Sequence, residues 1–290
     1  MSEVPRELRN EIPAFEGAPA SGRLESGPID WTALTAIRTA KNALEVGAIV
    51  GLAAAVFLGL DAVLRATNTP TYVFPRPIEV AKTLVSDFGS VYAPHLGVTM
   101  EEFLVGLALG STVGLLLAVV ITQRPFVEKV VAPYIIIMIT TPMVALVPFL
   151  RLKLGFGLSP IVLAVALASG PMVLINAATG FRRTDLAKIA LARSYGASTL
   201  QVFLKIRFPL ALPMIIIGYM VGSIFGLLTA VSGEMVAASE RGGLGHLLMY
   251  FASLARTPEF GAVILIIAGL GVAIYVIFYF IGKRWASWEA

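Results

Sequence analysis

The residue types that perform covalent or metal chemistry are scarce in this chain of 290 residues. It has no cysteine and only two histidines, His95 and His246, which lie far apart in the sequence. A thiol nucleophile and a thiolate metal site are therefore excluded, and a metal centre is not expected. The chain has no phosphate-binding loop, because Gly282-Lys283 lacks the glycine five residues upstream, and it has no zinc-protease or serine-hydrolase motif. We predict no catalytic residue, no metal ligand and no cofactor bound by this chain.

The charged residues instead concentrate in a polar segment, residues 185–213, between two long apolar runs. Residues 186–195 are good helix formers without proline or glycine and predict a helix. Gly196 then interrupts the pattern, as a residue able to adopt a left-handed backbone does at a helix end. A second short helix is predicted at about 199–206. On these residues alone, the segment could also be an ordinary hairpin between two membrane spans.

One acidic residue, Glu234, is closely associated with an apolar run. It follows Thr229, Ser232 and Gly233, so the run becomes more polar toward this end. A charge at such a position is costly and usually faces protein or water. Glu234 could therefore line a transport pathway, or it could lie at the membrane surface and pair with Arg241 or a backbone donor.

The amino-acid composition indicates the class of protein to which these residues belong. Hydrophobic residues make up 57% of the chain, charged residues only 14%, and the mean hydropathy is +0.85. A soluble domain carries about 25% charged residues, and several runs here approach the ~20 residues that cross a bilayer. The sequence thus predicts a polytopic helical membrane protein and excludes a soluble enzyme. The net charge of +4 suggests loops that face anionic lipid rather than a nucleic-acid partner.

We predict an all-α membrane protein with a largely flexible N-terminal tail at 1–42 and a transmembrane domain at 43–290. The segment at 78–88 is amphipathic and is expected at the membrane interface. A glycine-rich connection at 236–258 is expected to dip partway into the membrane. The six predicted spans lie at about 43–64, 98–121, 126–149, 160–181, 210–235 and 260–282.

The distribution of Lys and Arg predicts the orientation of these spans. With six spans and the N-terminus inside, 15 of the 22 basic residues fall on the cytoplasmic side and 7 on the other. The positive-inside rule therefore places both termini and the polar segment in the cytoplasm. The bias is firmest in that segment and just before it, at Arg182, Arg183, Lys188, Arg193, Lys205 and Arg207.

Glycines recur at every fourth residue in three predicted spans, and the stripe at Gly218, Gly222 and Gly226 continues into the polar end of the fifth. Such stripes let helix backbones approach closely, which accounts for them as generic packing. Alternatively, these faces flank a pathway and slide during a transport cycle. On that reading the pathway or gate residues are Gly222, Gly226, Thr229, Ser232, Glu234 and Met235, with Thr140, Thr141 and Pro142 of the third span.

The polar segment resembles the cytoplasmic "EAA" loop of bacterial ABC-importer permeases. Ala192, Gly196, Ile206 and Pro209 fall at the matching spacings, and the run from Arg193 to Ser198 resembles the usual run around the glycine. The similarity covers about residues 75–285 and is closest to the branch that imports nitrate, sulfonates, taurine, bicarbonate and some vitamin precursors. The chain departs from the pattern where Ala190 replaces the leading acidic residue and Leu191 replaces the next alanine.

The resemblance implies a type I permease subunit in a bacterial inner membrane, with residues 182–209 as its coupling loop. Two cytosolic ATPase subunits would bind ATP and Mg²⁺, an extracytoplasmic protein would deliver the solute, and a second permease copy or a paralogue would complete the pathway. The coupling helix would contact the ATPase through Ala190, Leu191, Ala192, Arg193, Ser194, Tyr195 and Gly196. Because a carboxylate repels the anions that this branch carries, a gate role is favoured for Glu234.

Two other classes remain as alternatives. An ion-driven secondary transporter would need acids at mid-depth in broken helices, and only Glu234 comes near this, because Glu101 and Glu102 are expected at the interface. A membrane scaffold without transport activity is the other alternative. The transported solute and the pairing of permeases, homodimer or heterodimer, are not readable from the sequence.

Overall fold

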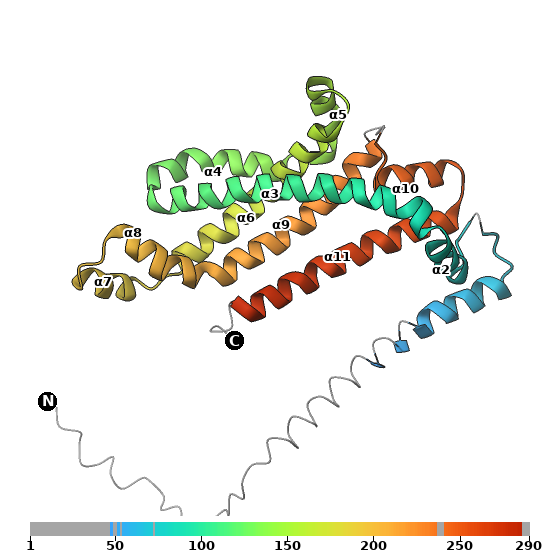
Figure 1. The fold of residues 1–290 in the computed structure, drawn as a ribbon, viewed down its shortest axis with the longest axis horizontal. Helices are drawn as coiled ribbons and strands as arrows, with labels where there is room; N and C mark the ends of the chain where they lie inside the picture. Colours follow the sequence, from blue (N-terminus) through green and yellow to red (C-terminus); the bar gives the residue numbers. More distant parts are fainter. Residues whose placement is uncertain (1–46, 49–50, 53, 72, 237–240, 286–290) are drawn as a thin grey trace, which may run out of the picture. The chain divides into compact units, whose positions relative to one another are not determined.

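The computed structural model describes residues 47–48, 51–52, 54–71, 73–236 and 241–285, all of them helix, turn or irregular connection. The chain divides into residues 1–56 and residues 57–290. Most of the predicted first span, 43–64, lies outside the described residues or in the first of these units, and residues 54–66 are helical. The second unit is a bundle of long helices (Figure 1).

Three helices form the centre of the bundle: α3 (Ala93–Gln123), α6 (Leu158–Arg182) and α9 (Phe208–Val236). Each is apolar around most of its circumference, as a helix between protein and lipid is. Several of their glycines face the backbone of a neighbouring helix. A Cβ on Gly110 would lie 2.4 Å from the Ala166 carbonyl oxygen, and one on Gly222 would lie 3.1 Å from that of Ser169. The glycine stripes therefore bring α3 and α9 against α6.

The predicted third span does not run as one helix. Instead α4 (Pro125–Thr140) and α5 (Met143–Leu154) are bent by 98° relative to each other. Thr141 takes an extended backbone with ψ 124°, because the ring of Pro142 disfavours the helical region for the residue before it. A proline inside a membrane helix permits a kink, and the break falls at Pro142. The span predicted at about 126–149 is therefore a broken pair of helices, and whether the pair crosses the membrane stays a prediction.

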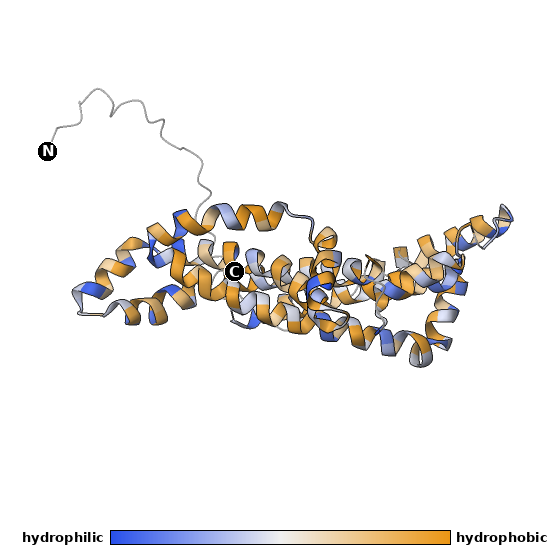
Figure 2. Cartoon of the chain, turned by 90° about the horizontal axis from the view of Figure 1, so that it is seen from above, coloured by the Kyte–Doolittle hydropathy of each residue, from blue (hydrophilic) through white to orange (hydrophobic). Residues whose placement is uncertain are grey.

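The second, fourth, fifth and sixth predicted spans are confirmed as helices long and apolar enough to cross a membrane. They correspond to Phe88–Gln123, Leu158–Arg182, Thr199–Val236 and α11 (Thr257–Trp285), and the bent α4–α5 pair provides up to one more. The 18-residue apolar windows differ in burial, with 61% of residues buried in α6 and 6% in α11. The hydrophobic residues that dominate these helices (Figure 2) thus face protein at the centre and are left to lipid or a partner on α11.

Two shorter helices complete the described bundle. The predicted amphipathic segment forms α2 (Pro77–Ser86), which packs on α11 near the start of α3. The predicted glycine-rich connection contains a short apolar helix, α10 (Leu244–Ser253). This helix packs against α9, α11 and the start of α3. The polar segment, with α7 (Leu186–Ser194) and α8 (Thr199–Val202), lies at the opposite end of α9 (Figure 1).

Candidate functional site

The polar segment folds as the sequence predicts: helix, sharp turn, helix. The Asp185 carboxylate accepts the Ala187 N–H at 2.8 Å and caps the start of α7. At its end, Gly196 has φ +80° and donates to the Arg193 carbonyl, while Ala197 donates to that of Ala192. This pair of bonds is a Schellman motif, whose left-handed residue is usually glycine. A second cap begins α8, where Ser198 and Gln201 bond reciprocally to each other's backbone N–H.

The surface of this segment is apolar as well as basic. Tyr195 is 84% exposed and Leu191 is 60% exposed. Ala190, Arg193, Ser194 and Gly196 are also exposed, whereas Ala192 is half-buried. Large apolar side chains held outward by a capped, rigid turn are typical of a surface that binds another protein. The exposed large apolar side chains of the segment are Leu186, Leu191, Tyr195, Leu200 and Leu204.

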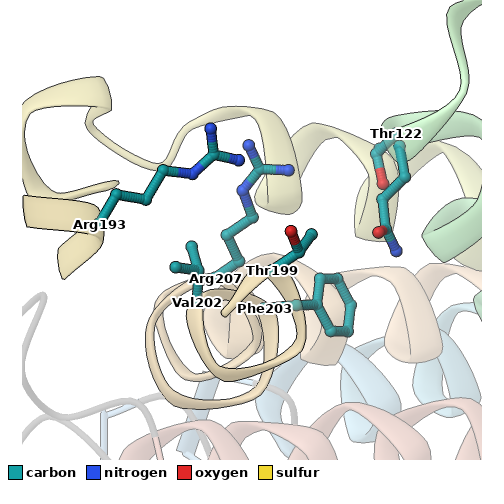
Figure 3. A pocket seen from close by; sticks show the side chains of 7 residues that line it. Thr122, Arg193, Thr199, Val202, Phe203 and Arg207 are labelled. Carbon is teal, nitrogen blue, oxygen red and sulfur yellow. The ribbon is translucent and has the colours of Figure 1, made fainter. Parts of the chain in front are cut away.

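Two arginines from this segment converge on one pocket of about 200 Å³. Arg193 of α7 and Arg207 of the π-helical segment Phe203–Arg207 both reach into it, and their guanidinium ends lie close together (Figure 3). Neither arginine forms a salt bridge within the described residues. Neighbouring guanidinium groups repel unless an anion lies between them, so the pocket suits a carboxylate or a phosphate. The remaining lining residues are Thr122, Gln123, Thr199, Val202 and Phe203.

A second pocket, of about 260 Å³, lies where α4 bends into α5 against α6 and α9. It brings together three of the predicted pathway residues: Thr141 at the bend and Thr229 and Ser232 on α9. The rest of its lining is mostly apolar, with Met138, Met143 and Phe225 among it. A few polar groups on an apolar wall is the usual make-up of a small-molecule site.

The other predicted pathway residues lie apart from this pocket. Gly222 and Gly226 pack against α6, as close helix packing requires. The Thr140 hydroxyl donates to the Ile136 carbonyl within α4. Pro142 precedes α5 and is exposed, and Met235 is 38% exposed at the end of α9.

Glu234 lies at a third location, beside the N-terminus of α10. The first N–H groups of a helix have no partner within it, and here side chains of α3 and α9 accept them. Gly243 donates to His95 Nδ1 at 2.9 Å, Leu244 to Thr99 Oγ1 at 2.8 Å, and Gly245 to Glu234 Oε2 at 2.7 Å. We call these three donors and three acceptors the α10 cap. It ties the start of α3 and the end of α9 to α10.

The cap depends on glycine at its donor positions. A Cβ on Gly243, which has φ +122°, would lie 2.3 Å from Glu234 Cδ. A Cβ on Gly245 would lie 2.0 Å from the Val231 carbonyl oxygen. The carboxylate therefore reaches the helix end only because no side chain lies in between. A negative charge at this end is also favoured by the helix dipole.

Two alternative partners were expected for Glu234, Arg241 or a backbone donor. Arg241 forms a salt bridge of 2.8 Å with the partly exposed Glu101, and the donor to Glu234 is the Gly245 N–H. Glu102, expected at the interface like Glu101, is 0% exposed and lies on the side of α3 that faces Glu234. The reason is helical geometry: Glu101 and Glu102 are adjacent on α3, so their side chains project in directions about 100° apart.

Sequence reasoning missed Glu102, His95 and Thr99 as members of one cluster, and it did not pair Arg207 with Arg193. A signal existed for part of the cluster, because positions 95, 99 and 102 are spaced i, i+4, i+7 and share one helix face. The approach of α10 to that face involves contacts across more than 140 residues of sequence. Neither composition nor periodicity predicts such a contact.

Comparisons with known proteins agree on one family. Residues 110–287 match the family described as the binding-protein-dependent transport system inner membrane component. A probable ABC transporter permease of Haemophilus influenzae is 31% identical over 207 residues, which are 71% of this chain and 83% of that protein. A putative aliphatic sulfonates transport permease of Escherichia coli is 26% identical and covers 80% of this chain and 89% of its own length.

A solved structure confirms the fold. The MetNI methionine ABC transporter, in an inward-facing conformation, contains a chain with 21% identity and a TM-score of 0.54. The match covers 66% of this chain and 92% of that one. The apolar helices, the fold and the family match together show that this chain belongs to the binding-protein-dependent transport system inner-membrane components: it is a multi-pass membrane permease subunit of an ABC importer.

Proposed function

We propose that this permease crosses the membrane six times, with both termini in the cytoplasm, and that its polar segment couples it to a separate ATPase. The chain has no nucleotide-binding loop, so ATP and Mg²⁺ belong to that partner. The observation that carries the proposal is the exposed, doubly capped helix α7 with apolar side chains facing outward. Its rigid turn at Gly196 would transmit the motion of the ATPase to α6 and α9.

The ATPase contact is proposed to include an acidic side chain that binds between Arg193 and Arg207. The pocket is lined by Arg193 of α7 and by Arg207, and no carboxylate is among its lining residues in the described part of the chain. The family's acidic residue is absent at Ala190, so the ion pair across the interface would have the opposite polarity. Charge pairs of this kind contribute to affinity mainly when they are desolvated.

The solute path is proposed to pass the pocket between the α4–α5 bend and α9. Thr229 and Ser232 supply neutral hydroxyl groups, which suit a small anion without holding it tightly, while the Thr141 hydroxyl donates to the Ile137 carbonyl at 2.7 Å. A second permease copy or a paralogue would form the opposite wall, since one bundle leaves this pocket open on one side. The solute class remains that of the resembling branch: a sulfonate, taurine, nitrate, bicarbonate or a vitamin-precursor-like molecule, delivered by an extracytoplasmic binding protein.

Reconstitution tests this function directly. The permease in liposomes, with the ATPase encoded next to it and the adjacent solute-binding protein, should accumulate solute only with ATP present. Uptake that follows an ion gradient without the ATPase would instead support a secondary transporter. Omission of the binding protein should abolish uptake, and the solute that it binds should define the substrate.

The α10 cap is proposed as the gate on the side opposite the ATPase. Its three hydrogen bonds join α3, α9 and α10, so separation of these helices must break them. Glu234→Gln keeps the size of the side chain but weakens the bond to Gly245, since a charged acceptor binds more strongly than a neutral one. We expect normal insertion, reduced transport and raised basal ATPase activity. Normal transport by this variant would exclude the gate role.

A further inference from the structure

Glu102 has no role in the cap as described, although it is one of the most deeply buried charged side chains in the described residues. Glu102 is 0% exposed and Glu234 is 1% exposed. Thr99 Oγ1 and Glu234 Oε2 accept the N–H groups of the consecutive residues Leu244 and Gly245, so these two side chains are neighbours. Glu102 follows Thr99 by three residues on the same face of α3, which brings its carboxyl group beside that of Glu234. Both oxygens of Glu102 and Oε1 of Glu234 lack a donor within the described part of the chain.

Two ionised carboxylates are not compatible with this arrangement. Each is a pure acceptor, and like charges in a buried site repel strongly. No Lys, Arg or His forms a salt bridge with either of them among the described residues. A single proton between the two groups would remove one charge and supply the missing donor, as in other carboxylate pairs that share one proton.

The other titratable groups around the pair are already engaged. On α3, Glu101 binds Arg241 at 2.8 Å in a partly exposed salt bridge. His95 accepts the Gly243 N–H through Nδ1, so it is neutral with its proton on Nε2. His246 of α10 stacks on His95 with ring centroids 6.3 Å apart. Arg241 acts on Glu102 only at a distance, through its charge, and none of these groups forms a salt bridge with it.

We propose that Glu102 holds a proton and donates it in a hydrogen bond to the Glu234 carboxylate, forming a buried proton-binding site between α3 and α9. Glu234 is the anion because its other oxygen accepts from the N-terminus of α10, where a negative charge is stabilised. Glu102 receives no backbone N–H and is therefore the neutral partner.

The site makes the gate dependent on protons. When the α10 cap opens, water reaches Glu102, and its proton leaves to solvent as the carboxylate becomes hydrated. Closing requires that one proton return, so alkaline conditions favour the open cap. This consequence rests on the gate role proposed for Glu234, whereas the proton site itself depends only on the geometry of the closed cap.

Infrared spectroscopy of the purified full-length permease tests the proton directly. A buried protonated carboxyl group gives a carbonyl stretch separate from the amide and carboxylate bands. We expect this band in the wild type at neutral pH, its loss in Glu102→Gln, and its retention in Glu101→Gln, which alters the neighbouring partly exposed acid. Absence of the band from the wild type, or its persistence in Glu102→Gln, would overturn the proposal.

Thermal unfolding across pH provides a second test. Because the folded state holds a proton that an unfolded glutamate has already released above about pH 4.3, wild-type stability should fall as pH rises from there. Glu102→Gln supplies a permanent N–H donor and should flatten this slope, while Glu101→Gln should keep it. An unchanged slope in Glu102→Gln contradicts the proposal. If that variant does not fold, titration of the wild-type infrared band against pH still decides.

Two further outcomes distinguish a bound proton from a bound cation, and the proton site from the gate role. If added Na⁺ or Ca²⁺ abolishes the band and raises the melting temperature, the pair holds a cation and the proton assignment is wrong. If Glu234→Gln transports normally while Glu102→Gln still loses the band, the gate role fails but the proton site stands.

Discussion

At its N-terminal end, α9 continues from the polar segment, where Tyr195 is 84% exposed and the two arginines of the pocket have no salt bridge among the described residues. At its C-terminal end, Glu234 is 1% exposed and accepts a hydrogen bond from α10. Both ends include a helix terminus next to charged side chains, and the unpaired backbone groups of that terminus need hydrogen-bond partners. The first end uses only local caps and leaves its side chains free, whereas the second uses side chains from two other helices.

The difference indicates what each end binds. A surface whose backbone groups are hydrogen-bonded, but whose side chains have no partner, is suited to bind another protein. A surface with buried polar cross-links is satisfied within the chain and must break those bonds to move. One end of α9 is therefore suited to receive motion from the ATPase, and the other to resist motion until it is driven.

The orientation of the two ends of the bundle in the membrane should give the largest effect, because a cysteine at either end is labelled from one side of the membrane or not at all. The chain has no cysteine, so single variants need no altered background. We expect Ser198→Cys to react with a membrane-impermeant maleimide only from the cytoplasm, and Thr71→Cys only from outside. Labelling of Ser198→Cys in intact cells would reverse the orientation of the two ends.

Loss of the turn at Gly196 should nearly abolish transport-linked ATP hydrolysis. Valine there has open space, since no atom lies within 4 Å of a Cβ, but φ +80° costs a residue with a side chain about 1–2 kcal/mol. The strain would redirect α7 without affecting insertion. The matched control is Gly196→Asn, because asparagine tolerates this backbone and should retain most coupling. Equal ATPase activity in the valine variant and the wild type would exclude a coupling role.

Crowding of the α10 cap should lower stability by about 1–3 kcal/mol, the usual cost of overpacking. Gly243→Ala places its Cβ 2.3 Å from Glu234 Cδ. Gly269→Ala is the control on α11, where a Cβ meets nothing within 4 Å. Melting temperatures of the purified proteins compare them. If both variants melt at the wild-type temperature, the cap does not hold α10 closed.

The arginine pocket should give the smallest effect. Arg193→Ala together with Arg207→Ala should weaken binding of the ATPase about tenfold, or about 1.4 kcal/mol, as a partly exposed charge contact would. Arg256→Ala is the control, because Arg256 pairs with Glu259 at the opposite end of the bundle. Co-purification and titration by surface plasmon resonance measure the difference. Unchanged affinity in the double variant would leave the apolar side chains as the whole contact.

Much of the fold could be predicted because its signals are local. The apolar runs predicted four spans that the structure confirms as helices, and the helix-forming residues at 186–195 and the interruption at Gly196 predicted α7, its turn and a following short helix. The 98° break between α4 and α5 was harder, since a proline in a membrane helix permits anything from a slight bend to a full turn. Only the packing of α5 against α6 and α9 selects the angle.

The candidate site likewise has features that the sequence predicts and contacts that it does not. The sequence by itself determined the membrane class, the basic polar segment and the helix ends, because hydropathy and capping act over a few residues. Tertiary structure alone decided that Glu102 is buried against Glu234, that His95 and Thr99 accept from α10, and that Arg207 joins Arg193. These contacts join side chains whose partners are set by how whole helices pack, and a single sequence carries no local record of that packing.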